Sequence, residues 1–405
     1  MTNRTDDAQP RRARIAVTVV FALNGFLAAM WVAHIPVITD RTGVSHETLG
    51  GLLLLLGGSA FVGMQLCGPL IDRFGSRPLT IIAVSVLAVA VLGPVLATGT
   101  VSLALAMVAF GFANGGLDVS MNSQAVVVEQ AYPRPIMSAF HAYFSVGSMI
   151  GSAIVALTLW VDVGVVATVV GAAIFAVVVL ALVAPQLSVD DVAATQLSGQ
   201  TQPRWWHRVD RSRLVLLAIV AFALMLAEGT AYDWSALQVV ETFNVPDASG
   251  AIAFFAFSAA MTVTRFVIDP IAAAIGPAAV VRIGAAIGAI GMAIVVVSAN
   301  FDDAQWIATA GWLIFGIGLA GGIPQIFTAA GNLSPVASGQ VISAVVGCGY
   351  LGMLAGPAVV GLLSHLTSLS SALVVVIVAL GVALAFAGQV NKRASTTGSS
   401  SIQLS

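Results

Sequence analysis

Charged residues are scarce in this sequence. Lys, Arg, Asp and Glu make up only 8% of the 405 residues, whereas a soluble globular domain has roughly 25%. So few charges cannot cover the surface of a water-soluble protein of this length. The formal net charge of −2 also argues against a nucleic-acid partner, because phosphate backbones bind to basic surfaces.

Cysteine is scarce as well. The two cysteines, Cys67 and Cys348, lie in apolar segments of different halves of the chain, and we interpret both as small core residues rather than as a disulfide. No group of Cys and His residues has the spacing of a metal site, and the sequence has no nucleophile–base pair and no phosphate-binding loop. We therefore expect no metal, no cofactor and no enzymatic activity. A membrane enzyme or a sensor is the alternative from another class.

Apolar residues are abundant and are grouped in long segments. They make up 59% of the chain, and the segments have the roughly 20 residues that a helix needs to cross a bilayer. Barrel strands would instead alternate over about 10 residues. We predict an all-α membrane protein with twelve transmembrane helices, near residues 15–38, 48–70, 79–98, 102–124, 136–160, 163–184, 214–236, 249–268, 278–298, 304–327, 337–364 and 370–390.

Basic residues fix the predicted orientation, because cytoplasmic loops retain Lys and Arg. Nearly all of them fall on one side of the twelve-span arrangement, and only Arg41 falls on the other. Arg265 and Arg282 are assigned to a position near the basic surface. Both termini are therefore predicted to be cytoplasmic.

The chain is predicted to consist of two six-helix bundles, residues 1–184 and 214–405, joined by a cytoplasmic linker over 185–213, the longest polar interval. An internal repeat supports this division, since Ser138-Ala139, Gly147 and Gly151 recur at one constant spacing as Ser343-Ala344, Gly352 and Gly356. Parallel repeats of this size are a known transporter design, with the substrate site between the halves. Pro324 is expected to kink the tenth span, because it lacks a backbone N–H.

A motif follows the second span: Gly68-Pro69-Leu70-Ile71-Asp72-Arg73-Phe74-Gly75-Ser76-Arg77. It resembles the loop signature of the major facilitator superfamily, which implies a role in conformational gating for Gly68, Asp72, Arg73, Gly75 and Arg77. The corresponding motif of the second half is degraded, because alignment of Gly276 on Gly75 puts Ala273 opposite Asp72. Arg265 and Asp269 remain as the nearby charges, and at this spacing they can pair on one helix face or contribute to the gate.

Four further segments, at 116–122, 138–147, 227–234 and 349–357, are similar to the YbjJ-type branch of bacterial major facilitator proteins, which is broadly related to fucose-permease-like carriers. The resemblance implies a multi-pass protein of the bacterial inner membrane. One departure is His34, where an Arg is expected, and this weakens the transfer of an anion-binding role.

Polar residues inside the apolar spans are the candidate site, because a charged side chain at the bilayer centre costs about 2.5–3.5 kcal/mol on insertion scales. Asn114, Asp118 and Asn122 share one helix face, and Glu129 follows near the cytoplasmic mouth. We expect Asp118 and His141 to lie at comparable depth. A carboxyl group and an imidazole in a partly dry cavity suit proton transfer, because burial disfavours the charged form of each.

Glu228 on the seventh span is the second proton-carrier candidate. The remaining substrate candidates are Asp233, Asn24, Trp31 and Trp234. Each has a structural alternative: a hydrogen-bond network for Asp118, His141 and Glu228, the interfacial aromatic belt for Trp31 and Trp234, and solvation by headgroups for Glu129 and His34.

These observations predict a secondary transporter that moves a small organic solute by alternating access, with proton symport as the favoured form. The hypothesis rests on Asp118 and Glu228 lying buried without a basic partner at mid-depth. The alternative is a proton-antiport efflux pump for drugs or metabolites. Because the spans are expected to lack a cavity Lys or Arg, a neutral or cationic solute is favoured. We expect the carrier to act as a monomer.

Overall fold

The computed structural model describes residues 8–44, 46–189, 209–334 and 337–391. Over these residues the protein is all-helical, with twelve helices long and apolar enough to cross a membrane. The predicted fold class is therefore confirmed. Most of the predicted linker lies outside the described residues, so the boundaries proposed for the two halves stay a prediction.

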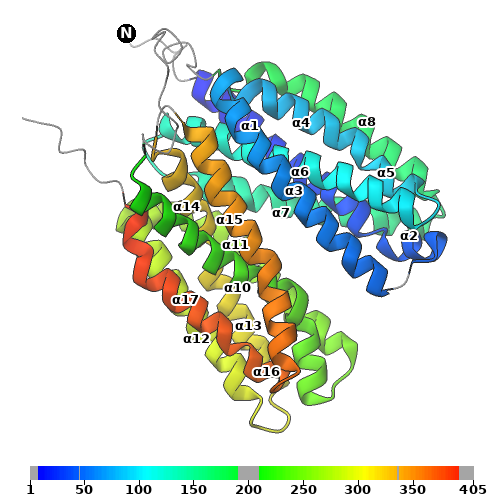
Figure 1. Ribbon diagram of the computed structural model, residues 1–405, viewed down its shortest axis with the longest axis vertical. Coiled ribbons are helices and arrows are strands. Elements are labelled where there is room, and N and C mark those ends of the chain that lie inside the picture. The colour runs from blue at the N-terminus through cyan, green and yellow to red at the C-terminus, as the bar shows by residue number, and fades with distance from the viewer. Residues whose placement is uncertain (1–7, 45, 190–208, 335–336, 392–405) are drawn as a thin grey trace, which may run out of the picture.

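The first half of the chain forms one bundle, which we call the N half (Figure 1). Its elements are α1 (Ala8–Val32), α2 (Ile35–Thr42), α3 (His46–Phe74), α4 (Ser76–Ala90), α5 (Leu92–Leu96), α6 (Thr100–Gln130), α7 (Met137–Trp160), α8 (Val165–Val183) and the short 3₁₀ helix η1 (Ala184–Gln186). The predicted first span is interrupted between Val32 and Ile35, so that its last residues form the separate helix α2.

The second half of the chain forms the other bundle, which we call the C half, and its long helices follow one another as those of the N half do. Its elements are α10 (Arg211–Phe243), α11 (Asp247–Ile275), α12 (Pro277–Ser298), α13 (Gln305–Leu319), α14 (Gly322–Gly331), α15 (Ser338–Ser364), α16 (Leu369–Ala372), α17 (Val374–Phe386) and the 3₁₀ helix η3 (Ala387–Val390). The tenth span breaks between α13 and α14 because Pro324 has no N–H for the carbonyl of Ala320. The predicted kink is thus found one turn before the proline.

The internal repeat is visible in the packing of the helices. A Cβ on Gly147 would overlap the backbone of Ala22 in α1, and a Cβ on Gly352 would overlap the backbone of Phe222 in α10. These glycines let α7 approach α1 and α15 approach α10 closely, where no hydrophobic effect drives helix association. The matching glycines of the repeat therefore have the same packing role in each half.

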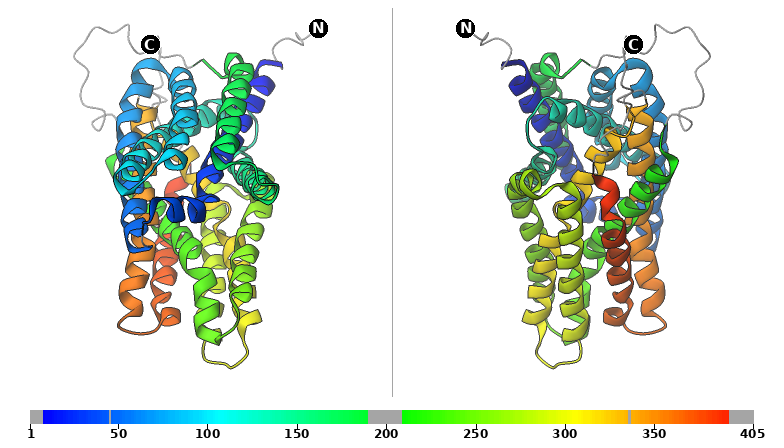
Figure 2. Two further views of the ribbon diagram at one scale, coloured as in Figure 1. Left: turned by 90° about the vertical axis from the view of Figure 1, so that its right-hand side faces the viewer. Right: turned by 90° about the vertical axis from the view of Figure 1, so that its left-hand side faces the viewer.

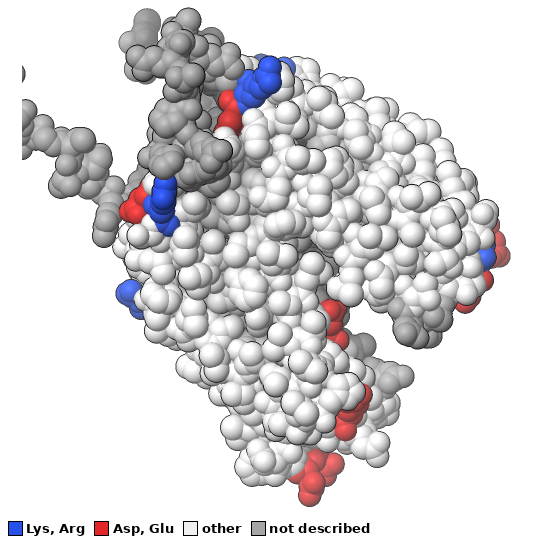
Figure 3. Space-filling view, in the orientation of Figure 1, with Lys and Arg blue, Asp and Glu red and all other residues white. Residues whose placement is uncertain are grey.

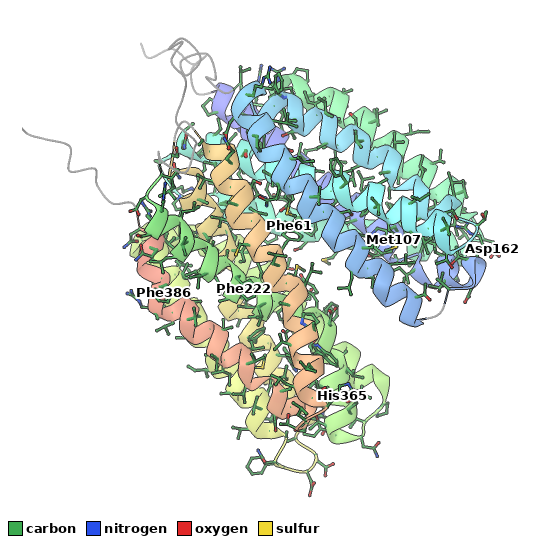
Figure 4. All side chains as sticks on the ribbon, in the orientation of Figure 1. Phe61, Met107, Asp162, Phe222, His365 and Phe386 are labelled. Carbon is green, nitrogen blue, oxygen red and sulfur yellow. The ribbon has the colours of Figure 1, made fainter. Side chains whose placement is uncertain are left out.

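The two bundles are inclined to each other and meet at one end only (Figure 1). At this closed end α3 packs against α15, and α11 packs against α7. The other, open end carries α2 and α16, and Figure 4 shows Asp162 and His365 on its two separated tips. Figure 2 shows from two further sides that the helices of each bundle run side by side.

Charge is distributed unevenly along this axis. In Figure 3 most visible Lys and Arg side chains surround the closed end, and most visible Asp and Glu side chains lie towards the open end. Cytoplasmic surfaces retain basic residues, so the distribution agrees with the predicted orientation. In the predicted orientation, the closed end faces the cytoplasm.

Candidate functional site

Asp72 holds the two halves together at the closed end. Its carboxylate accepts hydrogen bonds from the backbone N–H groups of Gly339 (2.7 Å) and Gln340 (3.0 Å) and from the Gln340 side chain (2.8 Å). These donors form the start of α15, where exposed N–H groups and the helix dipole attract a negative charge. Asp72 thus caps a helix of the opposite half.

The other motif residues support this contact. Gly68 lies against Gly339 and Ser343, so a larger residue would separate α3 from α15. Gly75 makes the turn after α3 with φ of 85°, a conformation that favours glycine. Arg73 stacks on the ring of Phe74 at 5.1 Å, and Arg77 is half-buried at the start of α4.

Asp269 makes the equivalent contact from the C half. Its carboxylate accepts the N–H groups of Ser138 (3.1 Å) and Ala139 (2.9 Å) at the start of α7. The pairing of Asp269 with Arg265 on one helix face, considered from the sequence, is therefore wrong. The second half does have a counterpart of Asp72, which alignment on Gly276 had missed.

Glu129 is the third carboxylate at the closed end. One oxygen accepts the N–H groups of Ile136 and Met137, and the other accepts the hydroxyl of Thr328 in α14, at 2.6 Å. The expectation that headgroups solvate Glu129 is wrong, because it is only 8% exposed. Glu129 and Asp269 together satisfy four successive N–H groups at the start of α7.

Glu228 and Arg265 form an ion pair inside the C half. Their side chains are 13% and 6% exposed, and the Arg265 Nη2 lies 3.1 Å from the Glu228 Oε1. Two predictions are therefore wrong: that Glu228 lacks a basic partner, and that Arg265 lies near the cytoplasmic surface. The preference for a neutral or cationic solute was based on the expected absence of an interior Lys or Arg, and Arg265 removes that basis.

His141 lies at the junction of the two halves. Its ring packs edge-on against Phe21 of α1 and lies 5.8 Å from the ring of Phe327 of α14. Its Nε2 is buried without a hydrogen-bond partner among the described residues. The imidazole is also within electrostatic reach of Arg265, so it faces the C half.

His141 and Asp118 differ in depth. Glu129 ties the end of α6 to the start of α7, and Asp118 lies eleven residues before Glu129 whereas His141 lies four residues after Met137. At 1.5 Å per residue, these positions are about 16 Å and about 6 Å from the closed end. The expected equal depth is not found, and Asp118 lies about two turns nearer the open end.

Asp118 differs from Glu228 in having no basic partner among the described residues. It is 8% exposed, and its Oδ1 accepts one long hydrogen bond from Asn122 at 3.4 Å while its Oδ2 has no partner in the described chain. Tyr350 of α15 is within electrostatic reach of both Asp118 and Glu228. Asp118 therefore lies near α15 of the C half.

Asn24 of α1 completes this wall of the N half. Its Nδ2 lies 3.5 Å from the sulfur of Met121, beside the turn of α6 that contains Asp118 and Asn122. Towards the open end, the ring of Trp31 packs against Phe110 at 6.0 Å and is buried. Trp31 is thus part of the α1–α6 interface and does not lie in an interfacial belt.

Other candidates lie away from this wall. Trp234 donates to the carbonyl of Pro357 (3.2 Å), a contact within the C half, and Asp233 beside it is exposed. His34 is fully buried at the break between α1 and α2, where its Nδ1 contacts the carbonyl of Met30 at 2.5 Å. Headgroup solvation of His34 is therefore wrong.

Sequence reasoning missed three participants: Arg265 as an interior charge, Tyr350 and Thr328. Arg265 was the one with a usable signal, because a charged residue so far inside an apolar segment seldom faces lipid. Tyr350 and Thr328 were not distinguishable from other polar residues of long helices.

A groove of about 680 Å³ on the N half is not part of this site. It lies between α1, α7 and α8, and apolar side chains such as Phe26, Ile150 and Phe175 dominate its lining. Such a surface suits lipid chains rather than a polar solute.

Known proteins resemble this chain over most of its length. A family model of the Major Facilitator Superfamily matches residues 8–156. An uncharacterized MFS-type transporter of Yersinia pestis is 30% identical over 359 residues, covering 89% of this chain and 91% of the relative. An uncharacterized transporter of Sinorhizobium fredii is 32% identical over 359 residues, covering 86% of this chain and 90% of the relative.

Among solved structures, the fucose:proton symporter FucP of E. coli superposes with a TM-score of 0.72 at 14% identity, covering 94% of this chain and 100% of the symporter. A FucP structure in the outward conformation gives a TM-score of 0.74 at 13% identity, covering 94% of this chain and 98% of that one. This similarity concerns the fold.

Proposed function

The chain belongs to the major facilitator superfamily of secondary transporters. On this premise we propose that it carries a small organic solute across the bacterial inner membrane, either in exchange for protons or together with them. The observation that carries the proposal is Asp118: a buried carboxyl group within electrostatic reach of Tyr350 of the opposite half, without a basic partner in the described chain. Within the superfamily we assign the chain to the YbjJ-type, fucose-permease-like branch. The carrier acts as a monomer whose halves are joined through residues 185–213.

Alternating access follows from the contacts of the closed end. If the termini are cytoplasmic, the conformation is outward-facing, and an inward-facing state requires this end to separate. The contacts that must break include hydrogen bonds of Asp72, Asp269, Glu129 and Gln130 to the opposite half. Two more join α3 to α15, from the Gln65 side chain to the carbonyl of Ser343 and from the Ser343 hydroxyl to the carbonyl of Met64. Water can replace each of them, because hydrogen bonding to water offsets most of the gain of a protein–protein bond. The closed end can therefore open at modest cost.

Proton coupling is assigned to Asp118 rather than to Glu228. Burial of an isolated carboxylate is unfavourable, so an unpaired buried acid is stable in its neutral form. Glu228 is paired with Arg265, so a charge on Glu228 is already compensated inside the protein. Asp118 must be neutralised before the two halves close around it, which makes reorientation dependent on its proton. The printed description of FucP as a fucose:proton symporter supports proton coupling on this fold.

The test uses purified protein in liposomes. A thermal-shift screen of sugars, amino acids, nucleosides and polyamines first identifies a ligand, because ligands that bind the folded state raise its melting temperature. Transport of that ligand is then measured with and without an imposed pH gradient. We expect the gradient to change wild-type transport several-fold and to have no effect on the Asp118→Asn variant.

The matched control is Asp162→Asn, the same chemical change on an exposed tip of the open end. Asp162 has φ of 56°, a conformation that asparagine tolerates well. This variant should respond to the gradient like the wild type. A gradient response that persists in Asp118→Asn would refute the assignment of coupling to Asp118.

A further inference from the structure

Four buried oxygen atoms without donors lie along the wall of the N half. They are Oδ1 of Asn24, Oδ1 of Asn114, Oδ2 of Asp118 and Oδ1 of Asn122, all without a hydrogen-bond partner in the described part of the protein. We call these four residues the acceptor cluster. Buried polar atoms are nearly always paired in native proteins, so the cluster lacks a ligand that donates hydrogen bonds.

The orientation of the amides is fixed by their other contacts. The Asn122 Nδ2 donates to the carbonyl of Asp118 at 2.8 Å and to its carboxylate, so a flipped amide would place oxygen against oxygen. The Asn24 Nδ2 similarly faces the sulfur of Met121, a weak acceptor. In Asn122 and Asn24 the oxygens, and not the NH₂ groups, are therefore the atoms left for a ligand.

Charge decides which donor fits. Among the described residues, two carboxyl groups, Asp118 and Glu228, lie in the interior between the halves. The one guanidinium group there, Arg265, already pairs with Glu228. Two titratable groups approach this part of α6: Tyr350 of α15, within electrostatic reach of Asp118, and Cys67 of α3, whose thiol donates to the carbonyl of Gly116. Neither carries a positive charge. Water could donate to the four oxygens, but it could not balance the negative charge of Asp118.

Resting on the function proposed above, we propose that the transported solute carries a primary ammonium group, which binds the acceptor cluster through Asp118 and Asn122. An ammonium group has three N–H donors and one positive charge. It therefore supplies both the hydrogen-bond donors and the positive charge that the acceptor cluster lacks. The opposite wall offers the unpartnered Nε–H of Arg265, which suits a hydroxyl or carbonyl oxygen at the other end of the solute. The substrate class is thus a small hydroxylated or carbonyl-bearing primary amine.

This substrate class determines the form of coupling. Asp118 can be neutralised by a proton or by the ammonium group, but its one negative charge cannot accommodate both at once. The two halves then close around Asp118 only when one of the two is bound. The carrier therefore exchanges a proton for the amine, and the favoured form becomes antiport.

The experiment compares matched pairs of solutes that differ in one group, with NH₃⁺ in one and OH in the other: glucosamine and glucose, ethanolamine and ethylene glycol, 4-amino-1-butanol and 1,4-butanediol. Melting temperature and affinity of the detergent-purified full chain are measured for each. We expect at least one amine to bind and its alcohol partner to bind at least tenfold more weakly. Asp118→Asn should weaken amine binding by about 10- to 100-fold, the contribution expected of a charge-assisted hydrogen bond, and Asp162→Asn should leave it unchanged.

Proton release separates this inference from the proposed function. In weakly buffered solution, amine binding to the wild type should release protons and should strengthen as the pH rises, and both effects should vanish in Asp118→Asn. Amine binding that depends on Asp118 but releases no proton supports the inference and refutes proton carriage by Asp118. Alcohols that bind as well as their amines, amines that bind Asp118→Asn as tightly as the wild type, or a panel in which no amine binds would overturn the inference.

Discussion

Replacement of Asp269 with alanine should move the protein from its conformation with one end closed towards one in which the closed end has separated. The carboxylate of Asp269 accepts two backbone N–H groups of α7 across the junction of the halves, at 3.1 Å and 2.9 Å. Alanine leaves both groups without their partner as long as the closed end stays shut. When this end opens, water reaches the start of α7 and satisfies them.

The size of the effect follows from these two bonds. A hydrogen bond to a charged group contributes about 1.5–3 kcal/mol, and water entering the variant recovers part of this. A net loss of roughly 2–4 kcal/mol shifts the conformational equilibrium by about 30- to 700-fold, since 1.4 kcal/mol is tenfold. Asp72→Ala should act in the same direction and more strongly, because Asp72 accepts three such bonds.

Spin labels on the two tips of the open end measure this shift. Asp162 and His365 are exposed and separated in Figure 4, so cysteines can replace them in a chain whose native Cys67 and Cys348 have been changed to serine. Closure of the open end should add a population with a shorter distance between the labels. Asp302→Ala, which removes an exposed acid from the loop between α12 and α13, is the control and should leave the distances unchanged. A distance distribution in Asp269→Ala identical to that of the control would refute the role of the α7 cap.

Two further predictions concern stability. Arg265→Gln should lower the melting temperature strongly, because it leaves Glu228 buried without its partner, at a cost of about 3–5 kcal/mol; adding Glu228→Gln should restore most of the loss, and a double variant no more stable than Arg265→Gln would contradict this account. Gly147→Leu should abolish the monodisperse folded protein in size-exclusion chromatography, because its Cβ would overlap the backbone of α1. Gly171→Leu is the matched control, since a Cβ there meets open space and leucine is a good helix former; equal yields of the two glycine variants would show that close approach of α7 to α1 is not required.

The spanning helices could be predicted from the sequence because a bilayer selects on composition and length, which are local properties. The same holds for Gly75 and Pro324, whose effects on the backbone depend only on their own geometry. Asp72, whose carboxylate joins the halves at the closed end, was found through a short motif. None of these inferences needed the arrangement of the helices in space.

Arg265 shows where such reasoning ends. Its distance from the end of α11 allows the side chain either to extend towards the cytoplasmic headgroups or to turn inwards, and the rotation of the helix decides between the two. That rotation is set by packing against α10, where Glu228 lies 37 positions away in sequence. The same contact gives Glu228 a basic partner. The rotation of α11, which the sequence does not reveal, therefore determines the roles of both Arg265 and Glu228, and it leaves Asp118 as the unpaired acid.

Asp269 escaped alignment for a geometric reason. Asp72 lies three residues before Gly75, whereas Asp269 lies seven residues before the equivalent Gly276, a displacement of four residues. In the repeat that matches Ser138 with Ser343, the first residue of α15, Ser338, corresponds to position 133, yet α7 begins four residues later, at Met137.

Four residues are about one helical turn, or about 6 Å, so the carboxylate has moved along α11 by the same step as the N–H groups that it caps have moved along α7. Glu129 accepts the N–H of Ile136, just before α7, which Asp269 does not reach. Its counterpart in the repeat, Ser334, accepts the N–H of Ala337 just before α15 in the same way. What the two halves share is therefore a carboxylate facing an open helix start across their junction, and this relation between helices is preserved even though no aligned residue is.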